Sequence, residues 1–273
     1  MHRYTWRTGV LEAVMILVGA IFMFPLYILV TLAFKAPGDQ TNKLLPTVDP
    51  TFDNFTQAWQ SGALGGALMN SALVTIVSVT AIVLFSAAAA YPLSRVGAHW
   101  SKFTYFGFLA GLLLPAQLAL LPLYQTMRDL GLLGSLWSVI IVSVGSSMPF
   151  SVFLYCGFLR ALPPDYEEAA SLDGASAFRA FWSIVFPLVR PITGTVIILN
   201  AVAIWNEFLT PLLYLSNSSH KTITVAINGF VGQYGAQWNL IFAGILISIL
   251  PILLAYFLLQ KYIVQGFASG LKG

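Results

Sequence analysis

Charged side chains are scarce in this sequence of 273 residues, because Asp, Glu, Lys and Arg together make up only 8% of it. Soluble domains carry about 25% charged residues and about 45–50% apolar ones. Here the apolar fraction is 58%, so a soluble fold of this length would leave large apolar patches in contact with water. The composition excludes a soluble enzyme, a nucleic-acid-binding protein and a disordered chain. It predicts an integral membrane protein.

The sequence is also poor in residues that carry metal, redox or nucleotide chemistry. Its single cysteine, Cys156, lies in an apolar run, and we interpret it as a small buried residue. With three histidines and no CxxC or HExxH motif, the sequence gives no indication of a metal site. It contains no G-x-x-x-x-G-K-[ST] segment. We therefore expect no catalytic residues, and no cofactor bound by the chain itself.

Long uncharged stretches separated by short charged ones indicate an all-α, polytopic protein with six transmembrane helices. Each helix needs about 20 mainly apolar residues to cross a bilayer. The prolines inside these stretches predict kinks or broken helices, which in transporters line a cavity. The expected spans are approximately 13–34, 67–92, 103–127, 136–159, 191–215 and 240–259.

The lysines and arginines determine the expected orientation, because they gather on the cytoplasmic side of a membrane protein. If the N-terminus is cytoplasmic, most of them lie inside, and we expect both termini to be cytoplasmic. No small-residue cleavage site follows the first span, so we interpret it as a retained anchor. The exceptions that would lie outside are Lys35, Lys43, Arg128 and Lys221.

The internal loop 162–187 carries the strongest functional signal. Its acids favour the start of a short helix over 166–172, and Gly174 can adopt the positive φ that ends a helix. Ser176 can cap a second short helix. Because apolar residues beside carboxylates suit a protein partner better than anionic lipid, we expect a docking surface here. It would present Tyr166, Ala169, Ala170 and Leu172.

The spacing in this loop resembles the EAA loop of ABC importer permeases, whose pattern is E-A-A, x3, G, x9, I-x-L-P. Phe186 is the one departure, because it stands where Leu is usual. The segments Trp205-Asn206-Glu207-Phe208 and 260–267 resemble the MalG-type permeases of carbohydrate importers, and this resemblance covers essentially the whole chain. The matching residues of the loop are Glu168, Ala169, Ala170, Gly174, Ile184 and Pro187.

The resemblance implies a MetI-like importer permease fold in the plasma (inner) membrane of a bacterium or archaeon. It implies a permease subunit of an ATP-driven importer for a carbohydrate, such as an oligosaccharide or related glycoside, and half of a translocation path. The implied partners are a second, MalF-like permease, a dimeric ABC ATPase that holds ATP and Mg, and an extracytoplasmic sugar-binding protein.

The resemblance also divides the chain. Residues 1–66 would form an anchor helix and the first external loop, residues 67–263 the permease core, and residues 264–273 a cytoplasmic tail. The EAA loop would contact the ATPase, with Glu168 making a polar contact and the two alanines allowing close approach. Gln265 and Gly266 in the tail would contact the ATPase as well.

Glu207 is the only carboxylate well inside an expected span. Because ionisable groups within membranes are functional candidates by default, Asn206 and Glu207 are candidate contacts for a ligand in the cavity or for the binding protein. A structural cap at a helix break is the competing interpretation.

Other function classes stay open. An ion-coupled secondary transporter needs ionisable groups near the middle of the membrane, where only Glu207 is available. An intramembrane enzyme needs paired catalytic groups, and a non-transporting scaffold subunit would have no transport path. Copurification of an ATPase and a second permease would favour the importer.

Overall fold

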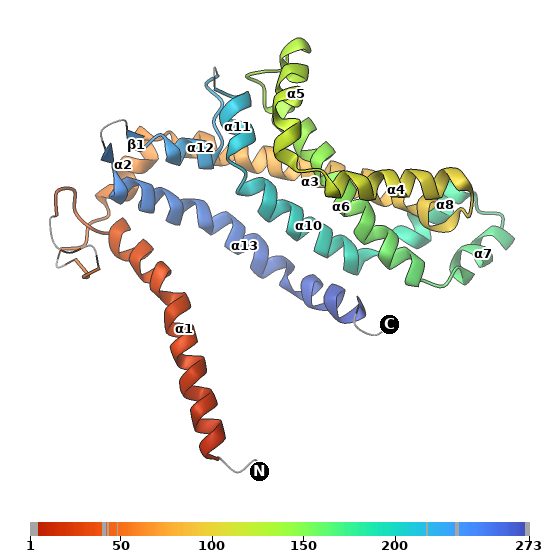
Figure 1. Ribbon diagram of the computed structural model, residues 1–273, viewed down its shortest axis with the longest axis horizontal. Helices are drawn as coiled ribbons and strands as arrows, with labels where there is room; N and C mark the ends of the chain where they lie inside the picture. Colours follow the sequence, from red (N-terminus) through yellow and green to blue (C-terminus); the bar gives the residue numbers. More distant parts are fainter. Residues whose placement is uncertain are drawn as a thin grey trace. The chain divides into compact units, whose positions relative to one another are not determined.

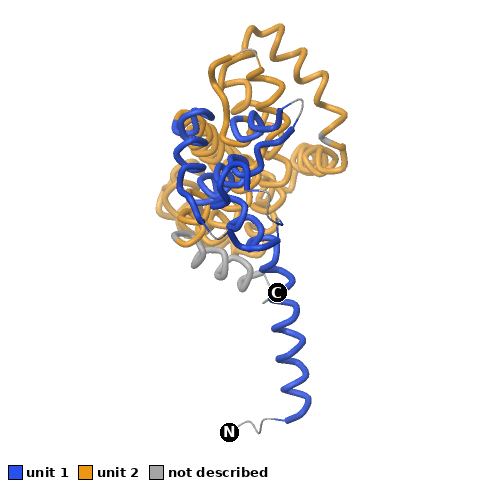
Figure 2. The backbone as a smooth tube through the Cα atoms, turned by 90° about the vertical axis from the view of Figure 1, so that its left-hand side faces the viewer, with its two compact units in different colours: residues 1–65, 226–250 blue, residues 66–225, 251–273 orange. Residues whose placement is uncertain are grey.

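The computed structural model describes residues 5–39, 42, 44–47, 49–216, 218–232 and 235–270, with backbone only for Ala116 and residues 258–270. Helices make up most of this part of the chain. The chain divides into two compact units, which we describe separately (Figure 2). Unit 1 comprises Met1–Gly65 and Ala226–Leu250, and unit 2 comprises Gly66–Val225 and Pro251–Gly273.

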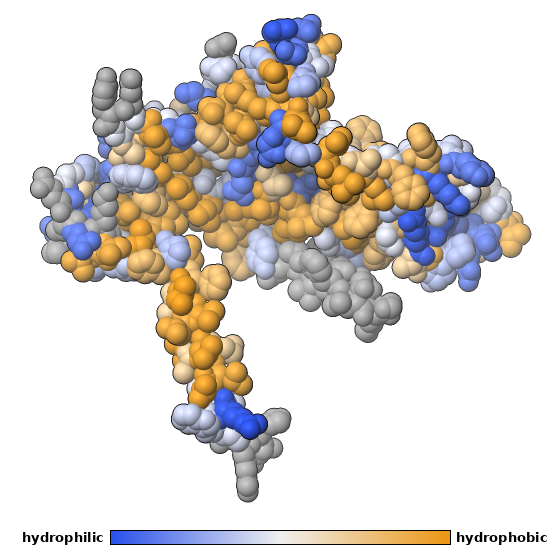
Figure 3. Space-filling model, in the orientation of Figure 1, coloured by the Kyte–Doolittle hydropathy of each residue, from blue (hydrophilic) through white to orange (hydrophobic). Residues whose placement is uncertain are grey.

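Unit 1 begins with α1 (Trp6–Ala33), a helix that is apolar on all sides. Only 6% of its most apolar stretch is buried, and Figure 3 shows a hydrophobic surface along most of its length, with hydrophilic residues near its N-terminal end. Such a helix is stable only against lipid or another subunit. The other elements of unit 1 are α2 (Asp53–Ser61), the antiparallel pair β1 (Val231–Gly232) and β2 (Gly235–Ala236), and the first part of α13 (Trp238–Gly270).

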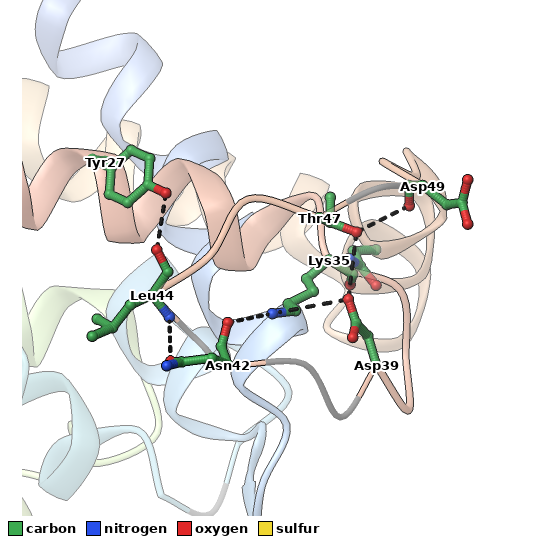
Figure 4. Close-up of polar contacts among 8 residues, drawn as sticks. Tyr27, Lys35, Asp39, Asn42, Leu44, Thr47 and Asp49 are labelled. Atoms are coloured by element: carbon green, nitrogen blue, oxygen red, sulfur yellow. Dashed lines mark hydrogen bonds and ion pairs between the residues drawn. The ribbon is translucent and has the colours of Figure 1, made fainter.

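The polar loop after α1 is held by a small network. The side-chain amide of Asn54 donates hydrogen bonds to the carbonyls of Ala33 and Lys35, both at 2.8 Å, and accepts one from Asn239 at 2.7 Å. Figure 4 shows the Lys35 ammonium donating to the carbonyl of Asn42 at 3.0 Å. Because the last carbonyls of a helix lack partners within it, Asn54 satisfies groups that a membrane helix leaves open.

Unit 2 contains the longest buried helices. Small residues let the helices approach closely: Ala87 and Ala90 are almost fully buried, and the sulfur of Cys156 lies 3.7 Å from the carbonyl oxygen of Ala90. The buried position of Cys156 is as predicted. The helices that lie wholly or partly in unit 2, besides the second part of α13, are α3 (Leu64–Arg95), α4 (His99–Leu113), α5 (Ala116–Asp129), α6 (Leu136–Ala161), α7 (Asp165–Leu172), α8 (Ala177–Ala180), η1 (Phe181–Val185), α9 (Phe186–Leu188), α10 (Arg190–Trp205), α11 (Leu209–Tyr214) and α12 (Ile223–Asn228).

Hydrogen bonds between side chains join α6 to α10. The amide of Asn200 donates to the hydroxyl of Ser151 at 3.1 Å, and the hydroxyl of Tyr155 donates to that of Thr193 at 3.0 Å. Polar side chains commonly join helices in this way in apolar surroundings, where water offers no competing bond. These bonds join two of the helices that line the cavity of unit 2.

The described helices confirm the all-α, polytopic fold class. Four are long and apolar enough to cross a membrane, and two bent pairs bring the number to six if each pair is one span. One pair bends by 105° between His99–Leu113 and Gln117–Asp129, and the other by 75° between Ala177–Leu188 and Arg190–Trp205. Pro115 and Pro191 stand at these breaks, since a proline cannot donate the backbone hydrogen bond that continues a helix.

Two further contacts in unit 2 involve basic residues or the backbone beside them. The guanidinium of Arg160 lies over the ring of Tyr105, 4.2 Å from its centre. The side-chain amide of Asn70 donates to the backbone carbonyl of Lys221 at 3.0 Å.

Candidate functional site

The first half of the EAA loop folds as predicted. Helix α7 begins after Pro164, and three acids in its first turn lie near the positive end of the helix dipole. Gly174 has a φ of +80°. The amide of Ala175 donates to the carbonyl of Ala170 at 2.9 Å, and that of Gly174 donates to the carbonyl of Ser171 at 3.0 Å. This Schellman motif ends the helix and needs a residue that tolerates positive φ.

Helix α7 is fastened to the end of α3 by an ion pair between Arg95 and Glu167. The Nη2 atom of Arg95 lies 2.8 Å from Oε1 of Glu167, and its Nε atom donates to the same oxygen at 2.9 Å. Nη2 also donates to the carbonyl of Leu162 at 3.2 Å. Both side chains are mostly buried, with 17% and 15% of their surfaces exposed. A paired, hydrogen-bonded guanidinium in partial burial gives α7 a fixed place.

The exposed face of α7 differs in one residue from the prediction. Glu168 and Ala169 are exposed, and Leu172 is 90% exposed. Ala170, which the sequence assigns to the docking surface, is buried with 6% exposure. The expectation for Ala170 is therefore wrong, because a helix of this length must turn one side toward its own chain. Its small side chain lets α7 pack closely on unit 2.

The second half of the loop forms one continuous run from α8 through η1 and α9. The hydroxyl of Ser176 accepts a hydrogen bond from the amide of Arg179 at 3.3 Å, so the predicted cap is present. Phe181 and Val185 are buried in the core of unit 2. Ile184 and Pro187 are half-buried beside them. Ile184 and Pro187 of the EAA pattern therefore contribute more to the packing of the loop than to its exposed surface.

The second candidate region is the break between α10 and α11. Asn206 is exposed, and its amide donates back to the carbonyl of Val202 at 2.8 Å. Oε1 of Glu207 accepts a hydrogen bond from the amide of Thr210 at 3.0 Å. The carbonyl of Glu207 accepts from the hydroxyl of Thr224 at 2.8 Å. Glu207 is thus a cap at a helix break, which is one of the two interpretations of its sequence position.

Glu207 also lines a cavity of about 390 Å³ within unit 2. The walls come from α5, α6, α10 and α11, whose arrangement is visible in Figure 1. Glu207 is the one charged residue among the described residues that line it. Asn206 is not part of the lining. The remaining lining residues are Gln117, Leu120, Leu123, Val142, Ser143, Ser146, Ser147, Ala203, Ile204, Leu209, Thr210 and Tyr214.

The two remaining candidates, Gln265 and Gly266, fall in the last part of α13, where only the backbone is described. The helix continues through both positions, so this stretch of the predicted tail is helical. Contacts of their side chains lie outside the described residues. Residues 271–273 of the tail lie outside the described chain altogether.

Comparison with known proteins assigns the chain to a family. The family described as "Binding-protein-dependent transport system inner membrane component" matches residues 82–269. The chain belongs to this family. It is a multi-pass permease subunit of an ABC importer, and this membership agrees with the EAA pattern.

Named relatives cover nearly the whole chain. The melibiose/raffinose/stachyose import permease protein MelC of Bacillus subtilis is 34% identical over 255 residues, covering 93% of this chain and 92% of MelC. The probable starch degradation products transport system permease protein AmyC of Thermoanaerobacterium thermosulfurigenes is 33% identical over 256 residues, covering 93% of each chain.

One solved structure shares the fold. It is a crystal structure of a bacterial ABC transporter involved in the import of the acidic polysaccharide alginate. The match has a TM-score of 0.81 and 21% identity, and it covers 96% of this chain and 100% of the other. This likeness establishes the fold of the described chain.

Sequence reasoning missed two parts of the site. Arg95 stands far from Glu167 in the sequence, and nothing local indicates that they pair. The serines 143, 146 and 147 do carry a signal, because their spacing places them on one face of a mainly apolar helix. That spacing could have indicated a polar wall.

Proposed function

We propose that this chain forms half of the translocation path of an ATP-driven carbohydrate importer and receives the energy of ATP hydrolysis through α7. The proposal rests on one observation: one side of α7 is bound to α3, and the other side is exposed. The pair of Arg95 and Glu167 holds one side to α3. Glu168 and Leu172 stand on the exposed side.

The exposed side has the composition of a docking surface. Leu172 is 90% exposed and Phe178 is 75% exposed, which is costly in water unless a partner covers them. Glu168 beside them can accept charge-assisted hydrogen bonds from a cationic side chain. A dimeric ABC ATPase that carries ATP and Mg supplies such a partner. Movement of the ATPase would then reach α3 through Arg95.

The remaining partners follow from the same proposal. A second, MalF-like permease would complete the path, and an extracytoplasmic sugar-binding protein would deliver the substrate. Carbohydrate as the substrate class is supported by the sugars that name MelC and AmyC and by the polar wall of the cavity.

Coexpression tests the proposal. The chain is produced with the ATPase, permease and binding protein encoded beside it, and the purified complex is reconstituted in vesicles. We expect the ATPase and the second permease to copurify with the chain, and ATP-dependent sugar uptake to require all four proteins. Uptake by this chain alone, driven by an ion gradient, would instead identify a secondary transporter.

The proposal places both termini in the cytoplasm. The native Cys156 has no exposed surface, so a cysteine introduced elsewhere is labelled against a low background. In intact cells, an impermeant thiol reagent should label Ser219→Cys and not His2→Cys. Equal labelling of both variants from outside would overturn this orientation.

A further inference from the structure

The wall of the cavity in unit 2 presents hydroxyl groups that the protein itself does not use. Ser143, Ser146 and Ser147 line the cavity from α6, and Gln117 faces it from α5. Among the described residues, none of these four side chains makes a hydrogen bond, whereas many other hydroxyls of the helices donate to a backbone carbonyl. Polar groups that converge on a cavity without internal partners are suited to bind a ligand or water.

The charge of the cavity restricts that ligand. Among the described residues of the lining, Glu207 is the single charged one, and no lysine or arginine accompanies it there. A carboxylate can accept about four hydrogen bonds, and the amide of Thr210 supplies one of them. Sugar hydroxyls can supply others as charge-assisted bonds. An anionic sugar would meet an uncompensated like charge, which is an effective way to reject a ligand.

The size and the apolar part of the lining fit the same ligand class. A volume of about 390 Å³ lies near the lower end of the range of about 300–1,000 Å³ for small-molecule sites. Leu120, Val142 and Ile204 give the cavity apolar surface between the polar groups, and Tyr214 adds a ring. A sugar ring combines apolar C–H faces with a rim of hydroxyls. The cavity offers both kinds of contact.

We infer that this subunit itself binds a neutral, hydroxyl-rich sugar during transport, through Ser143, Ser146, Ser147, Gln117 and Glu207. The inference rests on the proposed transport function. The proposed function requires only that this subunit form one wall of the translocation path. The inference adds that the subunit contacts the substrate and prefers a neutral one.

Two matched variants test the contact in the complete importer. Ser146→Phe fills the cavity, and Ile141→Phe adds the same ring to the same helix at a position that is 46% exposed and outside the lining. Raffinose and stachyose are first tested with the wild-type complex, and the sugar that it transports is used for the variants. Uptake of this sugar is then divided by the amount of assembled complex. We expect Ser146→Phe to reduce uptake about tenfold or more and Ile141→Phe to change it less than about twofold. Equal uptake by both variants would overturn the contact.

Glu207→Gln gives an independent test that keeps the cap. The amide oxygen of glutamine still accepts the hydrogen bond from Thr210, whereas the negative charge is gone. We expect uptake of the neutral sugar to fall about three- to tenfold, since charge-assisted bonds become neutral ones. Unchanged uptake would show that the carboxylate does not bind sugar.

Thiol protection tests the charge preference without relying on the selectivity of the binding protein. Ser146→Cys complex without the binding protein is labelled with an impermeant thiol reagent in the presence of each sugar, and Ser219→Cys serves as the control. Raffinose should slow labelling at position 146 and not at 219, whereas an acidic alginate oligosaccharide should slow neither. Equal protection by both sugars would overturn the preference for neutral ligands.

The outcomes separate the inference from the function on which it rests. A wild-type complex that imports only acidic oligosaccharides would overturn the inference and leave the proposed importer intact. A wild-type complex that imports no sugar would overturn the proposed function first.

Discussion

Two regions of unit 2 place a carboxylate in partial burial, and they do so in opposite ways. At the α7 end, Glu167 is bound by Arg95 through two nitrogen atoms of one guanidinium. In the cavity, Glu207 accepts a backbone hydrogen bond, and the described part of the lining contains no cation. A bound cation fixes a carboxylate and uses up its lone pairs, whereas a backbone cap leaves most of them open. The first arrangement suits a fixed attachment between two helices, α7 and α3, and the second suits a ligand site.

The largest expected effect comes from Glu168→Lys, on the exposed side of α7. The change costs about 0.3–1 kcal/mol at the helix N-terminus and would remove the proposed charge-assisted bond to the ATPase, worth about 1.5–3 kcal/mol. We expect sugar uptake to fall about tenfold or more, through poor assembly or ATP hydrolysis without transport. Uptake and ATPase rates of the reconstituted complex measure the effect.

The matched control for this variant is Asp165→Lys, which reverses a charge in the same first turn of α7 and lies outside the EAA pattern. It should have the smaller effect. Glu167→Lys is unsuitable as a control, because it would set two cations against each other at Arg95. Equal losses from Asp165→Lys and Glu168→Lys would indicate a general effect of charge.

The ion pair between Arg95 and Glu167 is tested by Arg95→Glu. This variant sets two carboxylates against each other in partial burial, and we expect α7 to be held less firmly by about 1–3 kcal/mol. Uptake per ATP hydrolysed should fall several-fold while the chain still inserts in the membrane. The double variant Arg95→Glu with Glu167→Arg restores the pair and should recover part of the coupling. If the double variant shows no recovery, the ion pair does not contribute to the coupling between ATP hydrolysis and uptake.

A smaller effect is expected from removing residues 265–273. The stretch contributes little to the expected core, and we predict that the shortened chain assembles while uptake falls. Thermal melting of the complex and uptake are measured side by side. Normal uptake by the shortened protein would exclude an ATPase contact for Gln265 and Gly266.

The smallest effect concerns the cap on the cavity side. Glu207→Ala removes the acceptor for the Thr210 amide and should lower the stability of the complex by about 1 kcal/mol. Glu207→Gln keeps an acceptor and should melt near the wild-type temperature. If the two variants melt together, the side chain has no capping role.

Local sequence patterns predicted much of the coupling loop. Gly174 ends α7 and Ser176 caps α8, since turns and caps depend on residues only a few positions apart. Ala170 was wrongly placed on the surface, because a motif does not reveal which side of a short helix faces its own chain. The breaks at Pro115 and Pro191 follow from proline chemistry, but their bend angles depend on packing.

The sequence by itself determined that this protein spans a membrane, and it showed a loop that resembles the EAA loop of importer permeases. Composition is enough for the first conclusion, and the resemblance depends on a motif of residues close together in the chain. Only the tertiary structure paired Arg95 with Glu167 and brought the serines of α6 to the same cavity as Glu207. Contacts between distant residues are set by how helices pack, and packing uses side-chain shapes that no local pattern encodes.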